Sequence, residues 1–157
     1  MNDINKFTDD NLGGVMLFKF IPIEDVQEIP GAVNYFINTA VVLKTTCRWY
    51  EFYGTTGTIE LAEDSVETDA GTYYKKSLKA ISPKIRTELD ALFNEMKNRQ
   101  FILDVIDNNG IRKIIGSLAE PLKFKEKSST KNEASQRNEY AIEFFGEGVE
   151  KSFTYNL

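Results

Sequence analysis

Apolar residues are densest in the stretch 101–106, where five of six side chains are apolar, and three isoleucines follow within 111–115. The two parts are separated by the sequence DNNG at 107–110. Asn and Gly tolerate the positive φ angles that a tight turn between twisted strands requires. The pattern predicts a β-hairpin over Phe101–Gly116, placed at the centre of the core.

Other stretches either alternate between apolar and polar residues with a period of two or form short apolar runs, and both patterns are typical of β-strands. Strands are therefore predicted at 15–21, 36–44, 47–53, 58–63, 72–81, 121–126 and 140–145, with a last edge strand over 151–157. The acidic segment 64–71 and the polar segment 127–138 are expected to be loops, and the second of them exposed and mobile.

One segment has the periodicity of a helix. Its apolar residues share one stripe at helical spacing, namely Ile85, Leu89, Leu92, Phe93 and Met96. Ser82 suits the N-cap position and Pro83 the first helical position. The pattern predicts a helix from Pro83 to about Asn98 with a buried stripe, and Leu92→Ala is then expected to cost about 2–5 kcal/mol.

About eight strands, one helix and the absence of an internal repeat indicate a mainly β protein. The predicted fold is a β-sandwich or barrel with one flanking α-helix rather than alternating βα units. Residues 1–14 are polar and acidic and end in two glycines, which favours a flexible N-terminal arm. Residues 15–157 are expected to form one domain.

Composition narrows the possible chemistry. The chain of 157 residues has one cysteine, Cys47, and no histidine, so an internal disulfide, a multi-thiolate zinc site and the Ser-His and Cys-His nucleophile pairs are excluded. The longest apolar runs fall short of the roughly 18 residues that span a bilayer, and the polar N-terminus does not resemble a signal peptide. We expect no enzymatic activity, no cofactor and no membrane anchor, and synthesis in a reducing cytoplasm.

The net charge of −5 disfavours a protein that wraps nucleic acid, whose phosphates it would repel. Such a chain is compatible with a channel through which nucleic acid slides without sticking. The acidic residues Glu60, Glu63, Asp64, Glu67 and Asp69 form either a solvated or lumen-facing surface or a metal site. A calcium loop would need alternating oxygen ligands and a central glycine, which this segment lacks.

Two further groups of side chains have more than one interpretation. Trp49, Tyr50 and Tyr53 form a candidate aromatic surface. Their side chains either pack in the core, contact another protein at an interface, or stack on sugar rings. Lysines at 75, 76, 79, 123, 125 and 127 form either basic patches or the solvent-exposed faces of strands. On an edge strand, lysine also protects the sheet from unwanted pairing with another chain.

The order of elements in the C-terminal half resembles that of small virion proteins of tailed bacteriophages, in particular tail-tube-like proteins of phages and prophages of Bacteroidota. The matching pieces are a hairpin at Asp107–Ser117, an alternating strand at Pro121–Phe124, and a strand after a polar loop at Arg137–Gly146. These are structural motifs, and no catalytic residue is carried over with them.

The resemblance implies a subunit of the phage tail, made in the host bacterial cytoplasm and located in the virion. Copies would form hexameric rings that stack into a tube, with other tail or neck proteins as partners, and DNA would pass through the lumen without specific binding. A neck or tail-end subunit of the same fold would have a similar sequence. Lys127, Lys131 and Arg137 are candidate contacts to acidic residues of a neighbouring subunit.

Two other functions stay open at this point. The first is a carbohydrate-binding β-sandwich module that uses Trp49 and its aromatic neighbours. The second is an enzyme that works through carboxylates, although the sequence indicates no particular pair.

Overall fold

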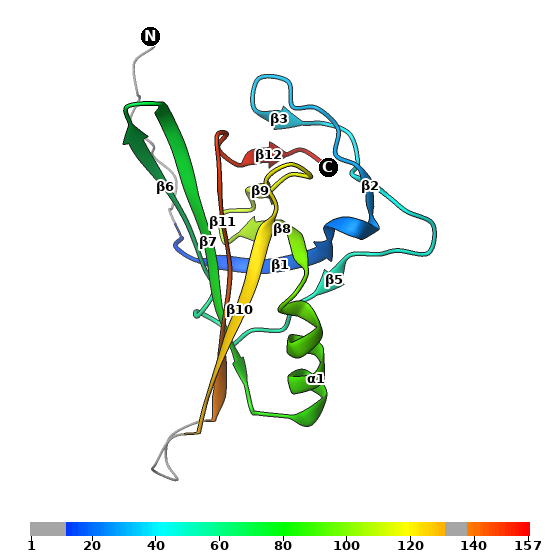
Figure 1. Ribbon diagram of the computed structural model, residues 1–157, viewed down its shortest axis with the longest axis vertical. Coiled ribbons are helices and arrows are strands. Elements are labelled where there is room, and N and C mark those ends of the chain that lie inside the picture. The colour runs from blue at the N-terminus through cyan, green and yellow to red at the C-terminus, as the bar shows by residue number, and fades with distance from the viewer. Residues whose placement is uncertain (1–11, 131–137) are drawn as a thin grey trace.

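The computed structural model describes residues 12–130 and 138–157 of the chain (Figure 1). Most of the predicted N-terminal arm and the candidate contacts Lys131 and Arg137 lie outside the described residues. The elements, in chain order, are β1 Val15–Pro22, the 3-10 helix η1 Ile23–Asp25, β2 Val26–Glu28, β3 Phe36–Ile37, β4 Val42–Leu43, β5 Tyr50–Glu51, β6 Glu60–Thr68, β7 Gly71–Pro83, α1 Thr87–Met96, β8 Gln100–Asp107, β9 Arg112–Ile115, β10 Leu122–Ser129, β11 Glu139–Gly148 and β12 Phe153–Tyr155.

Ten of the strands belong to one sheet that folds into two layers. One layer has the order β5-β1-β8-β9-β12-β3, and the other has the order β10-β11-β7-β6. They join at a corner, where β10 pairs with the first residues of β8. Strands of the second layer run along the long axis of the molecule, and β1 crosses them (Figure 1). The two layers and one flanking helix confirm the predicted β-sandwich-like, mainly β fold.

The hairpin of β8 and β9 lies at the centre of this arrangement, as the sequence predicted. Residues 101–105 of β8 are buried without interruption, because both faces of the strand are covered. At the turn, the Asp107 carboxylate accepts hydrogen bonds from the backbone N–H groups of Asn109 (2.9 Å) and Ile111 (2.8 Å). Gly110 there has a φ of 80°, which glycine adopts without strain.

The residues just before β1 are also attached to this turn. The Asn109 side chain accepts from the backbone N–H of Leu12 at 2.9 Å, and the Asn108 amide donates to the Gly13 carbonyl at 2.6 Å. The hairpin turn therefore holds the segment that leads into β1.

Two apolar clusters cover the two faces of β8. The larger cluster fills the space between the layers and α1, and its rings contact each other edge to face or tilted: Phe18, Phe20, Phe93, Phe101, Phe124, Tyr140 and Phe144. The smaller cluster lies on the other face of the first layer, under the segment that contains β2 and β4, and includes Ile21, Ile37, Ile102, Ile114 and Tyr155. Burial on both sides explains why β8 is so apolar.

Beside the smaller cluster, a buried ion pair fixes the last strand. The Arg112 guanidinium donates to both carboxylate oxygens of Asp104, at 2.7 and 2.5 Å, and Asp104 is 2% exposed. Arg112 also lies over the Tyr155 ring at 4.5 Å and donates to the carbonyl of Leu157 at 2.9 Å. The hydrogen bonds to Asp104 raise the pKa of Arg112, so the guanidinium stays charged.

The helix is shorter than predicted. Ser82 and Pro83 do not cap it, because they continue the ladder of β7, opposite Tyr140 and Glu139. The helix begins at Thr87 without a side-chain cap. Instead, the buried Tyr140 hydroxyl accepts from the backbone N–H of Arg86 (3.3 Å), at the position before the helix, and donates to Asp90 (2.6 Å). Burial raises the pKa of Tyr140.

The predicted burial of Leu92 is wrong. Phe93 and Met96 are 2% and 3% exposed, but Leu92 is 42% exposed. The helix flanks one end of the large cluster, so only a narrow stripe of it contacts the sheet layers. A Leu92→Ala change then removes fewer contacts than a buried leucine would, and the expected cost falls below the 2–5 kcal/mol of core positions.

Other predicted boundaries also change. The segments 36–44 and 47–53 contain only the two-residue strands β3, β4 and β5, because most of their backbone pairs with no other strand. The predicted acidic loop at 64–71 is instead the tip of a long hairpin, in which β6 and β7 pair without interruption from Glu60 opposite Lys79 to Thr68 opposite Gly71.

Candidate assembly surface

The four-stranded layer β10-β11-β7-β6 has one apolar face and one charged face. Its strands are 8, 10, 13 and 9 residues long, so they extend beyond the core. The inward positions are filled by buried side chains, which include Leu78, Ala80, Phe124, Ile142 and Phe144. The outward positions alternate with these and carry most of the charge, as expected for a sheet with one solvated face.

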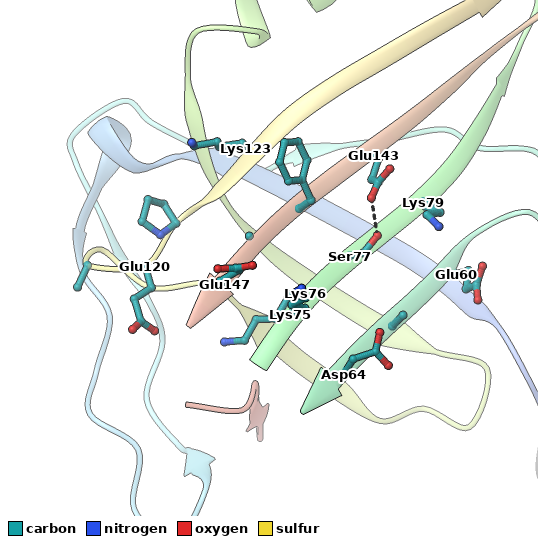
Figure 2. A pocket seen from close by; sticks show the side chains of 15 residues that line it. Glu60, Asp64, Lys75, Lys76, Ser77, Lys79, Glu120, Lys123, Glu143 and Glu147 are labelled. Atoms are coloured by element: carbon teal, nitrogen blue, oxygen red, sulfur yellow. Dashed lines mark hydrogen bonds between the residues drawn. The ribbon is translucent and has the colours of Figure 1, made fainter. Parts of the chain in front are cut away.

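On the outward face, lysines and carboxylates alternate in register. One row across the sheet reads Lys125, Glu143, Lys79 and Glu60 from β10 to β6. A second row reads Glu147, Lys75 and Asp64. Figure 2 shows Glu143, Lys79 and Glu60 on neighbouring strands, with Lys79 between the two carboxylates. Opposite charges on adjacent strands stabilise the pairing of the strands.

Counted over all outward positions of the four strands, the charges cancel. Five lysines stand at 75, 79, 123, 125 and 127, and five carboxylates at 60, 64, 139, 143 and 147. The chain as a whole carries −5. The outward face is therefore not the acidic surface that the composition suggested, and its lysines do not form a purely basic patch.

Glu143 has the best-defined contacts on this face. It is 2.9 Å from the Lys125 ammonium and accepts a hydrogen bond of 2.9 Å from the Ser77 hydroxyl, drawn as a dashed line in Figure 2. Partial burial raises the pKa of Glu143, but the bonds from Lys125 and Ser77 outweigh it and hold the pKa below its usual value. The carboxylate is ionised at neutral pH and holds β10, β11 and β7 together.

A shallow hollow of about 680 Å³ lies over this face, between the strands and the connection from β9 to β10. Glu120 and Lys123 border it on one side and Glu60 and Asp64 on the other (Figure 2). Within the described residues, no group of three or more His, Cys, Asp or Glu side chains is placed to hold a metal ion. The hollow is a wide polar surface without a focus of convergent groups.

The two edges of this layer differ in charge. The outer edge of β6 pairs with no described strand, and its sequence ELAEDSVET holds four acidic residues and no basic one. On the opposite side, β10 pairs with β8 only through Leu122 and Lys123, so its edge is open from 124 onward. The β10 sequence LKFKEKSS holds three lysines and one glutamate.

The residues singled out in the sequence fall into separate places. Lys127 is on the outward face near the open edge of β10, opposite Ala141, whereas Lys131 and Arg137 lie outside the described residues. Lys76 points inward and is 6% exposed, unlike its neighbours Lys75 and Lys79. Burial lowers the pKa of Lys76.

The three candidate aromatic residues have different surroundings. Trp49 packs against the smaller cluster, whereas the Tyr50 ring stacks on Phe20 of the larger cluster at 5.7 Å. Tyr53 is 78% exposed. A second hollow, of about 660 Å³, lies between β5 and α1 and is lined by Trp49 and Tyr50 together with Arg48, Leu92 and Arg99.

Sequence reasoning missed the outward face of β6 and β7 as a unit, because 64–71 was expected to be a loop. The apolar residues Ala62 and Val66 are visible in the sequence, but they share the outward face with Asp64, so no period-two alternation of apolar and polar residues marked the strand. The opposite charges of β6 and β10 were also visible in the sequence, but nothing in it showed that these strands form the two edges of one layer.

Comparison with protein-family models, with curated proteins and with solved structures finds no match to this chain. Among residues 12–130 and 138–157, no helix is long and apolar enough to cross a membrane.

Proposed function

We propose that this protein is a structural subunit of a bacteriophage tail, and specifically the tail tube protein, whose copies form stacked rings around a conduit for DNA. The observation that carries the proposal is the layer β10-β11-β7-β6, with its long strands, its charged outward face and its two open edges. The resemblance of the C-terminal half to tail-tube-like proteins supports it.

Open edges favour assembly because they present rows of unpaired N–H and C=O groups. Monomeric proteins usually avoid this with short edge strands, bulges or covering loops. Here β6 is nine residues long and pairs with β7 at every position without a bulge. A second copy of the chain, placed at this edge, would satisfy those groups, and repeated contacts of one kind produce a ring or a filament.

The outward face suits a surface that DNA passes without being held. Duplex DNA binds proteins mainly by releasing counterions when lysines and arginines neutralise its phosphates. On this face, cross-strand carboxylates stand beside Lys75, Lys79 and Lys125, so few positive charges are available to the phosphates. Weak, non-specific contact with DNA follows from that balance of charge.

Electron microscopy of the purified full chain tests the proposal, with sedimentation velocity as a second measurement. We expect tubes or six-fold rings at high protein concentration. Rings that do not stack would indicate a neck or tail-end subunit instead. A protein that stays a monodisperse monomer at every concentration up to about 1 mM would contradict the proposal. Specific contacts with a Kd of about 1 mM or tighter are populated in that range.

A carbohydrate-binding module is the second candidate, and one observation favours it. The hollow between β5 and α1 combines the Trp49 and Tyr50 rings with Arg48 and Arg99, and aromatic faces beside charged hydrogen-bond donors suit sugar rings. Glycan-array binding by a monomeric protein that is lost in Trp49→Ala would establish this function in place of the first. Tyr53→Ala is the matched control, since Tyr53 does not line the hollow.

A further inference from the structure

The acidic edge of the four-stranded layer is uniform in sign. Glu60 and Asp64 point to its outward face, where each stands opposite one lysine of β7 and has no described strand on its other side. On the inward side of the same strand, Glu67 adds a further carboxylate, whereas Glu63 is paired with Lys113 of β9 at 3.6 Å and accepts from the Ser152 backbone N–H. No lysine or arginine of β6 itself offsets them.

The other edge is basic along its open length. Lys125 and Lys127 point outward from it, and Lys123 stands where β10 meets β8. The single acid of β10, Glu126, is neutralised by Lys97 of the segment after α1 at 3.0 Å. A hollow of about 310 Å³ beside this corner is lined by Lys97, Arg99 and Lys123. Lys97 is paired with Glu126, and Arg99 is paired with Glu24 (3.2 Å) and Glu95 (3.2 Å), so the positive charge of this edge rests on the lysines of β10.

We infer that copies of this chain join edge to edge, with β6 of one copy pairing antiparallel with residues 124–129 of β10 in the next. The inference rests on the proposed tube function and names the contact that builds each ring. Each strand in the layer runs antiparallel to its neighbours, so β6 and β10 run in opposite directions within one copy. When a second copy is rotated into place beside the first, its β10 therefore runs antiparallel to β6 of the first copy.

The outward charges of the two edges are complementary across this contact. The row Lys125, Glu143, Lys79 and Glu60 begins with a lysine at one edge and ends with a glutamate at the other. The next copy therefore adds a lysine beside a carboxylate, and opposite charges on neighbouring strands stabilise pairing.

The same charges disfavour the competing contacts. Two β6 edges would set carboxylates against carboxylates, and two β10 edges would set lysines against lysines, which destabilises both symmetric pairings. Only the contact between unlike edges remains, and it joins copies head to tail. A head-to-tail contact either closes into a ring or continues as a filament.

Charge inversion at one edge at a time tests the inference. The first variant is Lys123→Glu with Lys127→Glu, and the second is Glu60→Lys with Asp64→Lys. All four side chains are exposed, and neither lysine has an ion pair with a described residue. In each variant alone, the outward charges of the two edges then have the same sign. We measure the assembled fraction by sedimentation velocity at the concentration where half of the unmodified protein is assembled. We expect this fraction to fall at least about tenfold in each variant.

An equimolar mixture of the two variants is the decisive sample. On the outward face, each edge of the first variant has a net negative charge and each edge of the second has only lysines as charged residues, so the two are complementary and we expect the mixture to recover assembly with alternating copies. Controls with the same changes in charge are Lys44→Glu with Lys151→Glu, and Glu28→Lys with Glu88→Lys, at exposed positions outside both edges. We expect each control to assemble like the unmodified protein.

The outcomes separate this inference from the proposed function. If the unmodified protein forms rings or tubes and either edge variant still assembles alone, or the mixture does not recover, the edge contact is wrong and the tube function stands. If the unmodified protein never assembles, both fall. Circular dichroism verifies the fold of each variant. If a variant is unfolded, a salt titration of the unmodified protein from about 0.05 M to about 1 M NaCl takes the place of that variant. Screening weakens exposed ion pairs, so assembly is expected to decrease. Undiminished assembly at high salt would overturn the inference.

Discussion

The β8–β9 hairpin and the β6–β7 hairpin differ in almost every physical respect. The first has strands of eight and four residues, is buried on both faces of β8 and ends in a turn that also holds Leu12 and Gly13. The second has strands of nine and thirteen residues, presents one face to solvent and leaves one edge unpaired by any described strand. One hairpin belongs to the core, and the other extends from it.

The difference indicates that stability and assembly are located in different hairpins. Apolar burial is the main source of folding free energy, and β8 contributes to both clusters, so changes there are expected to unfold the subunit. The outer half of the β6–β7 hairpin buries little apolar surface. Changes there are expected to leave the subunit folded and to affect contacts with other copies. Four substitutions test this separation.

The largest expected effect is on the central strand. Leu103 is 0% exposed and packs in the larger cluster, so Leu103→Ala removes buried methyl groups and leaves a cavity. We expect a loss of about 2–5 kcal/mol in the free energy of unfolding, measured by denaturant titration. Leu61→Ala on β6 is the control, since Leu61 is only partly buried. Equal losses in the two variants would contradict the separation.

The buried ion pair of the same hairpin is expected to give the next largest effect. Asp104→Asn keeps the shape of the side chain but removes the charge that Arg112 contacts with two hydrogen bonds. We expect a loss of about 1.5–3 kcal/mol, the range for hydrogen bonds to charged groups. The double variant with Arg112→Met should lose less than the sum of the two single changes. Strict additivity would mean that the pair contributes nothing.

At the tip of the long hairpin, stability should hardly change. Tyr73 stands opposite Val66 near the start of β7, and the pair lies on the outward face. Cross-strand pairs of this kind contribute about 0.2–1 kcal/mol. We expect Tyr73→Ala to unfold within about 1 kcal/mol of the unmodified protein while its assembly, followed by light scattering, becomes weaker. A large loss of stability with normal assembly would reverse the roles assigned to the two hairpins.

The smallest expected effect concerns Lys76, the inward-facing lysine of the long hairpin. Burial lowers its pKa in the folded state, so between the folded and unfolded pKa values the unfolded chain binds more protons. Stability then rises with pH toward about 10.4, the usual lysine pKa, as the buried charge is removed. We expect Lys76→Met to be as stable as the unmodified protein or more so at pH 7, and to lack this alkaline rise in thermal unfolding curves. A marked destabilisation at pH 7 would show that the ammonium group is favourable where it lies.

The elements whose signals are local could be predicted from the amino-acid sequence alone. The apolar run of 101–106 with its Asn-Gly turn predicted the central hairpin, because its burial and its turn chemistry both favour one conformation. The alternation around Leu122, Phe124, Tyr140 and Phe144 predicted strands at 121–126 and 140–145, which are parts of β10 and β11. These patterns were sufficient for the class of fold, a mainly β sandwich with one helix.

Only the tertiary structure decided the features that depend on distant partners. Ser82 and Pro83 have the residue types of a helix start, but pairing with Tyr140 and Glu139 keeps them in β7. Leu92 has helical spacing, but the position of α1 at the end of the large cluster leaves it exposed. The acidic edge of β6 and the basic edge of β10 are some sixty residues apart in sequence. They become the two edges of one layer only because β7 and β11 pair between them. The pairing of these strands depends on the burial of the whole inward face of the layer and not on any local sequence pattern.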